Sequence, residues 1–271
     1  MGLTILNNIA ALTAENQLDI TQNNLQKTLF QLASGSRINS GADDAAGLAI
    51  ADGLQANVTA LTQSQRNAND GIGQLQVADG ALSQVTSLLN RAVTLATESA
   101  NGTVGDSQRT ALNAEFVSIK SEIDSIGTNT TFNNTSVFSA SITSIFLSDS
   151  SASSSITLSV GAMSSNDLTL GSDNLISEAS SQSALTDLNT AIAQVASMRG
   201  TVGAVINRLQ AATSVMSNQV QNLTSAEDSI TAADIAGDVA DMSKYNILEQ
   251  TGMAALAQAN SSQQSILTLL K

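Results

Sequence analysis

The sequence predicts a mainly α-helical protein built from long helices, arranged as an antiparallel, coiled-coil-like bundle with a small β-hairpin region. The first observation is composition: 42% of the 271 residues are hydrophobic, yet only 2% are aromatic and none is proline or tryptophan. Proline breaks helices and makes up about 5% of an average protein, so its absence permits uninterrupted helices. The second observation is that apolar residues recur at steps of three and four, as on one helix face.

The first predicted helix covers residues 3–33. Its apolar residues form two short faces that are out of phase with each other. The first face holds Ile5, Ile9 and Leu12, and the second holds Leu18, Leu25, Leu29 and Leu32. Neither face is long enough for a core of its own, so this helix is expected to need a partner.

The segment "GSRINSGADDAAG", residues 35–47, is predicted to join two helices. It matches neither G-x-x-x-x-G-K-[ST] nor G-x-G-x-x-G, and no strand precedes it, which excludes a nucleotide-binding loop. Gly35 is predicted to end the first helix, while Asp43 and Asp44 place negative charge at the start of the next. With Asp52 they lack the spacing of a calcium loop.

A second long helix is predicted from Asp43 to the turn at Asn101–Gly102, with a local interruption between Gly71 and Gly80 because glycine disfavours helices. A third helix is expected over residues 106–127, capped by Asp106. Its single apolar face consists of Leu112, Phe116, Ile119, Ile123 and Ile126.

The middle of the chain changes character, because residues 139–183 are rich in serine and contain the alternating stretches "SITSIFL" and "SITLSV". Such alternation between turn residues predicts two or three β-strands in hairpins, within a region of about 132–183. A serine-rich disordered linker is the alternative.

Two further helices are predicted in the C-terminal third. The first carries an apolar repeat over five heptads and would be roughly 50 Å long. Its repeat consists of Leu188, Ile192, Val195, Arg199, Val202, Ile206, Leu209, Thr213, Met216, Val220 and Leu223. After a predicted break at 224–234, a second repeat runs out of phase with the first and contains four polar residues, so that helix is expected to need partners. It consists of Ile235, Val239, Met242, Asn246, Glu249, Met253, Leu256, Asn260, Gln263, Leu267 and Leu270.

Composition excludes several classes of function. The chain has no cysteine and no histidine, which removes thiol nucleophiles, histidine-dependent triads and the usual zinc ligands. A net charge of −13 opposes binding to nucleic acid. No basic N-terminal region precedes an apolar stretch, and no stretch approaches the length of a membrane-spanning helix. The sequence therefore predicts neither an enzyme nor a cofactor, a metal site, a cleaved signal peptide or insertion into a membrane.

Two stretches near opposite ends of the chain carry a family resemblance. "LASGSRINSGADDAAGLAIADGL" (32–54) resembles the N-terminal signature of bacterial flagellins, and "ILEQTGMAALAQANSSQQSILTLLK" (247–271) resembles their C-terminal signature. "RAVTLATESANGT" and "TFNNTSVF" resemble the stretches between, so the likeness covers about 1–138 and 184–271. One departure is "ADGL" at 51–54, where the family leads us to expect a basic residue near Gly53.

The resemblance implies a structural subunit of the extracellular flagellar filament, which serves motility and is exported without a cleaved signal peptide. It implies that residues 1–41 and 230–271 pair as an inner coiled-coil domain, disordered in the monomer. Residues 42–229 would form a helical rod with the β-hairpin region, and large outer domains would be absent. A hook–filament junction protein is the alternative.

The resemblance also implies partners and site residues. The partners are further copies of the chain, an export chaperone, and the filament cap and hook-junction proteins. The implied assembly residues are Ile5, Ile9, Leu12, Leu25, Leu29, Leu32, Ile235, Val239, Met242, Met253, Leu256, Leu267 and Leu270. Arg91, Leu95 and Glu115 match family positions contacted by the flagellin-sensing Toll-like receptor of the host. Val93 and Thr94 stand where charged residues are common, so weak recognition is expected.

Overall fold

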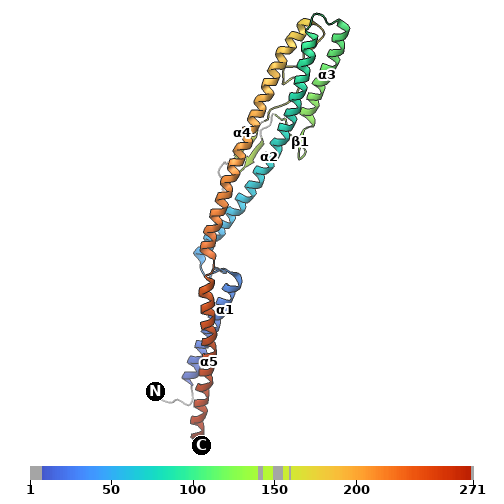
Figure 1. Ribbon diagram of the computed structural model, residues 1–271. Coiled ribbons are helices and arrows are strands. Elements are labelled where there is room, and N and C mark those ends of the chain that lie inside the picture. The colour runs from blue at the N-terminus through green and yellow to red at the C-terminus, as the bar shows by residue number, and fades with distance from the viewer. Residues whose placement is uncertain (1–7, 140–142, 149–154, 159, 270–271) are drawn as a thin grey trace. The chain divides into compact units, whose positions relative to one another are not determined.

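The computed structural model describes residues 8–139, 143–148, 155–158 and 160–269, and it is mainly helical (Figure 1). The helices are α1 (Ile9–Ser34), α2 (Ala45–Ser99), α3 (Asp106–Asn129), α4 (Glu178–Thr231) and α5 (Ile235–Leu269). The strands are β1 (Thr131–Phe132), β2 (Thr135–Ser136), β3 (Thr143–Phe146) and β4 (Ser155–Leu158). The prediction of long helices with a small β-hairpin region is confirmed.

The chain divides into two compact units. The first comprises residues 1–56 and 223–271, and the second comprises residues 57–222. The inner domain expected from the sequence, 1–41 with 230–271, falls within the first unit. In that unit α1 packs along α5.

The core of the second unit lies between α2 and α4, with α3 beside them (Figure 1). The buried residues recur at steps of three and four, so each helix turns one continuous apolar face to the other. They are Leu61, Ala68, Leu75, Ala78, Leu82, Val85, Leu89, Ala92 and Ala96 on α2, and Ala184, Leu188, Ala191, Val195, Val202, Leu209 and Met216 on α4. All members of the repeat predicted for α4 are buried or half-buried, which confirms it. The predicted apolar face of α3 is confirmed in the same way.

Helix α2 runs without interruption past its glycines, so the expected break between Gly71 and Gly80 is wrong. The physical reason is packing. A Cβ at Gly71 would overlap the Cδ1 atom of Ile145 and would meet Leu209 of α4. Glycine at this position therefore lets strand β3 approach the helix closely, which offsets the weak helix propensity.

Two antiparallel hairpins follow α3. Strands β1 and β2 pair Phe132 with Thr135, and the turn between them places Asn133 and Asn134 at φ 49° and 60°, where asparagine is favoured. Strands β3 and β4 pair Ile145 with Ile156. These strands lie in the two alternating stretches, which confirms the predicted hairpin. No third strand follows β4 among the described residues, and α4 begins at Glu178, inside the region predicted to be β.

An irregular segment, residues 163–175, lies on α3 and is held there by four buried apolar side chains and by hydrogen bonds between side chains of α3 and its backbone. The Oδ1 atom of Asn113 accepts from the amide of Leu175 at 2.8 Å, and Asp124 accepts from the amide of Ser165 at 2.6 Å. Between them the ammonium of Lys120 donates to three carbonyl oxygens, those of Leu170, Gly171 and Asp173. Helix α3 thus fixes the path of a segment that has no hydrogen-bonded ladder of its own.

Candidate functional site

The terminal helices α1 and α5 meet along a regular heptad pattern. Half-buried and buried residues recur at steps of three and four on both helices, as in a two-stranded coiled coil. This inner face consists of Ala11, Ala14, Leu18, Thr21, Leu25, Thr28 and Leu32 on α1, and of Asp238, Met242, Tyr245, Glu249, Gly252, Leu256, Ala259 and Gln263 on α5.

The inner face is small and polar compared with the core between α2 and α4. Its two fully buried side chains are threonines, Thr21 and Thr28, whose hydroxyls donate to carbonyls of their own helix. Across the pair, Gln22 donates to Glu249 at 3.3 Å, an exposed and long hydrogen bond. The large apolar residues of the inner face are only half-buried, so its packing stabilises α1 and α5 less than the fully buried core stabilises α2 and α4.

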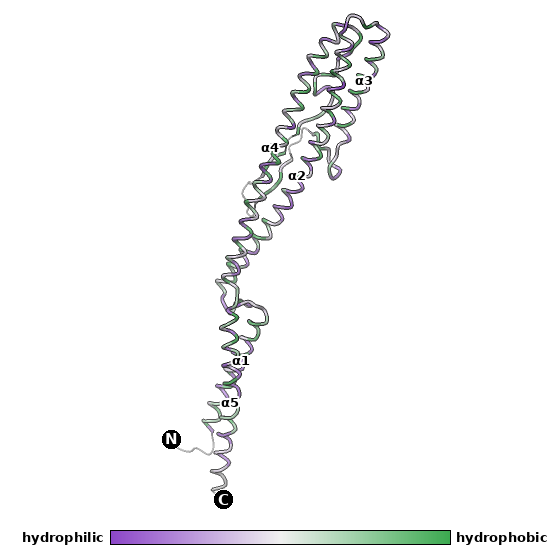
Figure 2. The backbone as a smooth tube through the Cα atoms, in the orientation of Figure 1, coloured by the Kyte–Doolittle hydropathy of each residue, from purple (hydrophilic) through white to green (hydrophobic). Residues whose placement is uncertain are grey.

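The same two helices expose large apolar side chains to solvent. Ile9, Phe30 and Ile247 are each more than 60% exposed. Among the side chains that the structure describes, this set, here called the exposed set, consists of Ile9, Leu12, Ile20, Leu29 and Phe30 on α1, and of Ile235, Val239, Ile247, Leu248 and Met253 on α5. Figure 2 shows the resulting mixture of hydrophobic and hydrophilic residues along both helices. Exposed apolar surface of this extent is typical of an interaction site.

The structure divides the sequence-predicted assembly residues between the two faces. Leu25, Leu32, Met242 and Leu256 lie on the inner face. Ile9, Leu12, Leu29, Ile235, Val239 and Met253 belong to the exposed set. Leu267 lies in the last turns of α5, while Ile5 and Leu270 lie outside the described residues.

Sequence reasoning missed four members of the exposed set: Ile20, Phe30, Ile247 and Leu248. These large residues stand between heptad positions, whereas nine of the fifteen inner-face residues are alanine, glycine, threonine, glutamine or charged. Large apolar residues outside the regular repeat were the available signal for an outward-facing surface.

The joint between α1 and α2 is built as predicted. Gly35 ends α1 at φ 69°, and Asp44 accepts from the amide of Gly47 at 2.8 Å in the first turn of α2. Asp43 accepts instead from Lys27 at 2.7 Å and from Ser40. The hydrogen bond from Lys27, followed by those from Ser40 and Asn39, lowers the pKa of Asp43 from 3.8 to about 2.

This joint also ends α4. The guanidinium of Arg37 donates to the carbonyl of Ile230 at 2.8 Å, and its backbone amide donates to Thr231 at 2.7 Å. Ser36 and Ala232 form an isolated antiparallel bridge. These contacts satisfy the last carbonyls of α4, which therefore continues to Thr231. The expected break at 224–234 is wrong in its extent, because only residues 232–234 interrupt the helices.

The prediction that Asp106 caps helix α3 is wrong, because the N-cap residue is Gly105. The Oε1 atom of Gln108 reaches back to accept from the amide of Gly105 at 2.9 Å. Asp106 lies in the first turn, where its charge is favourable to the helix dipole.

The three residues matched to receptor contacts lie in the second unit. Arg91 on α2 and Glu115 on α3 are exposed and form an ion pair at 2.7 Å. Leu95 is 1% exposed and belongs to the core. The structure therefore brings Arg91 and Glu115 together on the surface and leaves Leu95 beneath it.

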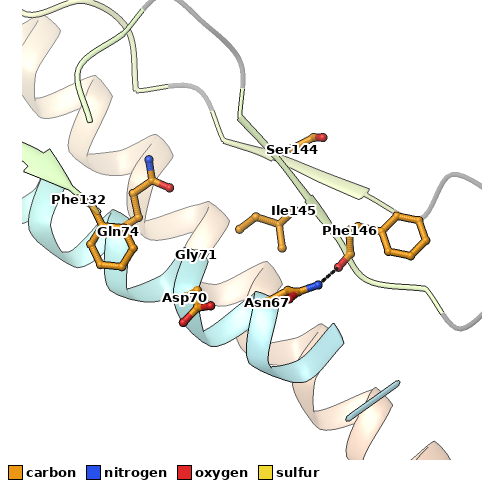
Figure 3. Close-up of a pocket in the computed structure, with 8 residues that line it drawn as sticks. All are labelled: Asn67, Asp70, Gly71, Gln74, Phe132, Ser144, Ile145 and Phe146. Atoms are coloured by element: carbon orange, nitrogen blue, oxygen red, sulfur yellow. Dashed lines mark hydrogen bonds between the residues drawn. The ribbon is translucent and has the colours of Figure 1, made fainter. Parts of the chain in front are cut away.

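A groove of about 350 Å³ lies between α2 and the strands (Figure 3). Ile145 points from β3 toward α2 at Gly71, and the amide of Asn67 donates to the carbonyl of Phe146 at 3.3 Å. Its only ionisable lining residue within the described ranges is Asp70. A single exposed carboxylate without a neighbouring nucleophile or base offers no catalytic arrangement.

Two negative findings apply to the described part of the chain. No three acidic side chains there are placed to hold a metal ion. None of the helices in those ranges has an apolar stretch able to cross a bilayer.

Two family models match the chain. The bacterial flagellin N-terminal helical region matches residues 5–143, and the bacterial flagellin C-terminal helical region matches residues 185–270. The first match covers α1, α2 and α3, and the second covers most of α4 and all of α5. The exposed set therefore lies within the two matched regions.

The chain is also similar over its length to individual proteins. It is 34% identical to a flagellin of Halalkalibacterium halodurans, covering 99% of this chain and 100% of that protein. It is 30% identical to a flagellar filament core protein of Treponema maltophilum, with the same coverage. The crystal structure of Bacillus cereus flagellin matches with a TM-score of 0.51 and 34% identity, covering 60% of this chain and 94% of that one. The chain thus belongs to the bacterial flagellin family, as a structural, non-enzymatic subunit of the extracellular flagellar filament that serves motility.

Proposed function

We propose that copies of this chain polymerise through the exposed set on α1 and α5. The observation that carries the proposal is the uneven distribution of exposed apolar residues. Among the side chains that the structure describes, these two helices expose five large apolar residues each. The rest of the described chain exposes Ile50 and Val77 on α2, and Val117, Phe146, Ile176 and Val215 one to an element or loop. The terminal helices therefore lose the most unfavourable hydration when another copy covers them.

The energetics favour a many-sided contact over a simple pair. Fully covering one Leu, Ile or Phe side chain is worth about 1.5–3 kcal/mol. Association opposes this gain with a cost of roughly 4–15 kcal/mol in lost freedom of motion. The members of the exposed set are 42–65% exposed, so covering one or two of them recovers less than about 4 kcal/mol and falls short of that cost. Neighbours that cover most of the set bring the gain into the range of the cost.

The polar inner face also bears on how far α1 and α5 are folded before assembly. Because α1 and α5 stabilise each other weakly, we propose that they gain full helical order when neighbouring copies cover the exposed set, at an entropic cost that burial offsets. Weak mutual packing also suits export in an unfolded state. We also propose an export chaperone, the filament cap and the hook-junction proteins as partners, because membership of the flagellin family implies them.

Substitution of outward residues tests the proposal. We expect Ile20→Ser with Ile247→Ser to prevent growth of filaments from added seeds, as seen by electron microscopy and by sedimentation. Val117→Ser with Val215→Ser is the matched control, because both residues are exposed on helices of the second unit. The control is expected to form long filaments.

The proposal is contradicted if the Ile20 and Ile247 variant forms filaments as readily as the unaltered chain. Circular dichroism and a thermal transition show whether the second unit of each variant remains folded. Growth that stops at short caps on foreign filaments would point instead to a junction protein.

We also propose that a host Toll-like receptor engages this chain weakly. Arg91 and Glu115 are accessible but already form an ion pair with each other. A receptor that binds either residue must replace this ion pair with new ones, so the net gain in binding free energy is small. Leu95 is buried and adds no exposed contact. A receptor reporter assay is expected to give a weak response, and activation at nanomolar concentration would contradict this.

A further inference from the structure

The turn between α2 and α3 contains the only Asn–Gly pair in the sequence, Asn101–Gly102. Asn101 is exposed, and the turn occupies residues 100–105. We propose that Asn101 is a site of spontaneous deamidation, at which the backbone of Gly102 acts as the nucleophile. This inference does not depend on how the filament assembles.

The reaction needs no enzyme and no reagent other than water. The backbone nitrogen of Gly102 attacks Cγ of Asn101, a C–N bond forms, and the Cγ–Nδ2 bond breaks. Ammonia leaves with the proton of the Gly102 amide, and a five-membered succinimide remains. Water then opens either carbonyl of that ring to give aspartate or isoaspartate. One water is consumed and one ammonia is released, with no oxidation or reduction.

The structure leaves the nucleophile available. The amide of Gly102 has no hydrogen-bond acceptor anywhere in the described ranges. Glycine also has no Cβ to hinder closure of the ring, and the nearest atom to that position, Oε2 of Glu178, lies 3.6 Å away on a flexible side chain. The electrophile is held nearby, because Oδ1 of Asn101 accepts from the amide of Thr103 at 3.2 Å. This bond keeps the side-chain amide on the C-terminal side of its own residue, where Gly102 lies, and polarises the carbonyl under attack.

The turn itself is anchored on both sides of the reacting bond. The amide of Asn101 donates to Glu98 at 3.1 Å, and its carbonyl accepts from Val104 at 3.1 Å. The same carbonyl accepts from Nη2 of Arg109 at 3.0 Å. The reacting groups are therefore held in one turn instead of sampling many conformations.

Arg109 supplies an unusual electrostatic setting. Its side chain is 5% exposed and donates to the carbonyls of Ser99 and Asn101, but it forms no ion pair with any described carboxylate. A buried cation without a carboxylate partner favours negative charge formed close to it. The Asn101 carbonyl that accepts from Arg109 belongs to the same peptide group as the Gly102 amide, so this bond favours loss of the proton on the attacking nitrogen. The carboxylate of Glu178, whose Oε2 lies 3.6 Å from the position of a Cβ on Gly102, opposes this effect.

The chain provides its own internal controls. Asp52–Gly53, Asp70–Gly71 and Asp79–Gly80 can form the same succinimide by loss of water. All three pairs lie inside α2, where the glycine amide donates to the carbonyl four residues earlier. In those pairs the glycine nitrogen is already hydrogen-bonded, and the helical backbone keeps it from reaching the aspartate side chain. Succinimide formation is therefore expected to be faster at Asn101 than at the three helical pairs. Because the filament is extracellular, each subunit stays in place after export and the conversion accumulates with its age.

The test is to incubate the purified full chain at mildly alkaline pH and to follow its peptides by mass spectrometry that separates aspartate from isoaspartate. We expect conversion at residue 101 with both products, and no isoaspartate at positions 52, 70 and 79. Gly102→Ala is expected to slow conversion severalfold without unfolding the second unit. The same chain unfolded in urea provides the reference rate for every pair.

Two outcomes would overturn the proposal. One is conversion of the unfolded chain at residue 101 while the folded chain stays unmodified, since the turn would then protect Asn101. The other is conversion at the helical Asp–Gly pairs at the same rate as at Asn101, since the structure would then provide no selection.

Discussion

At the scale of single residues, Gly127 shows how a missing side chain sets the path of a distant segment. It is buried on α3, and a Cβ at this position would overlap the carbonyl oxygen of Met163. A backbone atom in a packed segment has little freedom to move aside. The irregular segment 163–175 therefore begins its contact with α3 at a position that only glycine permits.

Two alanine substitutions separate this effect from helix propensity. Gly127→Ala is expected to lower the free energy of unfolding by about 1–3 kcal/mol, because it overpacks the contact with Met163. Gly80→Ala, on α2 with no atom within 4 Å of the added Cβ, is expected to raise it by up to about 1 kcal/mol. Urea denaturation measures both. Equal shifts in the same direction would contradict this account.

The ion pair of Asp79 and Arg199 links α2 to α4 through two parallel hydrogen bonds of 2.8 and 3.2 Å. The hydrogen bond from Arg199 is the main cause that lowers the pKa of Asp79 below 3.8. A carboxylate with a lowered pKa stabilises the fold above its unfolded pKa. That contribution is lost as the pH falls from 3.8 through the lower, folded value.

A double-mutant cycle checks this pair. Asp79→Asn and Arg199→Gln are each expected to lower the free energy of unfolding by about 0–1 kcal/mol at neutral pH, since both side chains are half-exposed. The double variant is expected to lose about as much as either single variant. The difference between the unaltered chain and Asp79→Asn should vanish in strong acid. Additive losses, or a difference that persists there, would contradict the assignment.

At the scale of elements, the buried face of a helix could be predicted from the sequence where large apolar residues occupy its inward-facing positions. The α4 repeat was predicted because Leu188, Val195, Val202 and Leu209 mark its buried face. The inner faces of α1 and α5 carry threonine, alanine and glutamate at equivalent positions, so the larger residues outside the repeat dominated the pattern. The β3–β4 hairpin was predicted from its alternation, whereas the short β1–β2 hairpin has no alternating stretch that could predict it. Gly71 is needed because Ile145, 74 positions away in the sequence, packs against the helix where a Cβ would lie. The periodicity of apolar residues cannot predict this contact.

The irregular segment offers a test at the same scale. Lys120→Met removes the ammonium that donates to three carbonyls and leaves those acceptors without that donor. We expect a loss of about 1–3 kcal/mol in the free energy of unfolding and faster proteolysis within residues 163–175. Glu122→Gln, an exposed change on the same helix, is the control. Unchanged proteolysis in the Lys120 variant would show that apolar packing alone holds the segment.

At the scale of the whole molecule, apolar burial must overcome repulsion between like charges. Every copy carries a net charge of −13, so copies brought together in a filament repel each other. We propose that the exposed set supplies the opposing attraction. It lies on two helices whose shared inner face buries fewer large apolar side chains than the core between α2 and α4. We therefore expect α1 and α5 to be fully ordered only in the filament, whereas the core between α2 and α4 is complete within one copy.

Hydrogen exchange resolved along the chain, compared between monomer and filament, tests this claim most directly. The account predicts strong protection of the α2 and α4 amides of the second unit in both states, because their core is buried within one copy. Amides of α1 and α5 are predicted to exchange quickly in the monomer and to become protected in the filament. Strong protection of α1 and α5 in the monomer, unchanged on polymerisation, would contradict the claim.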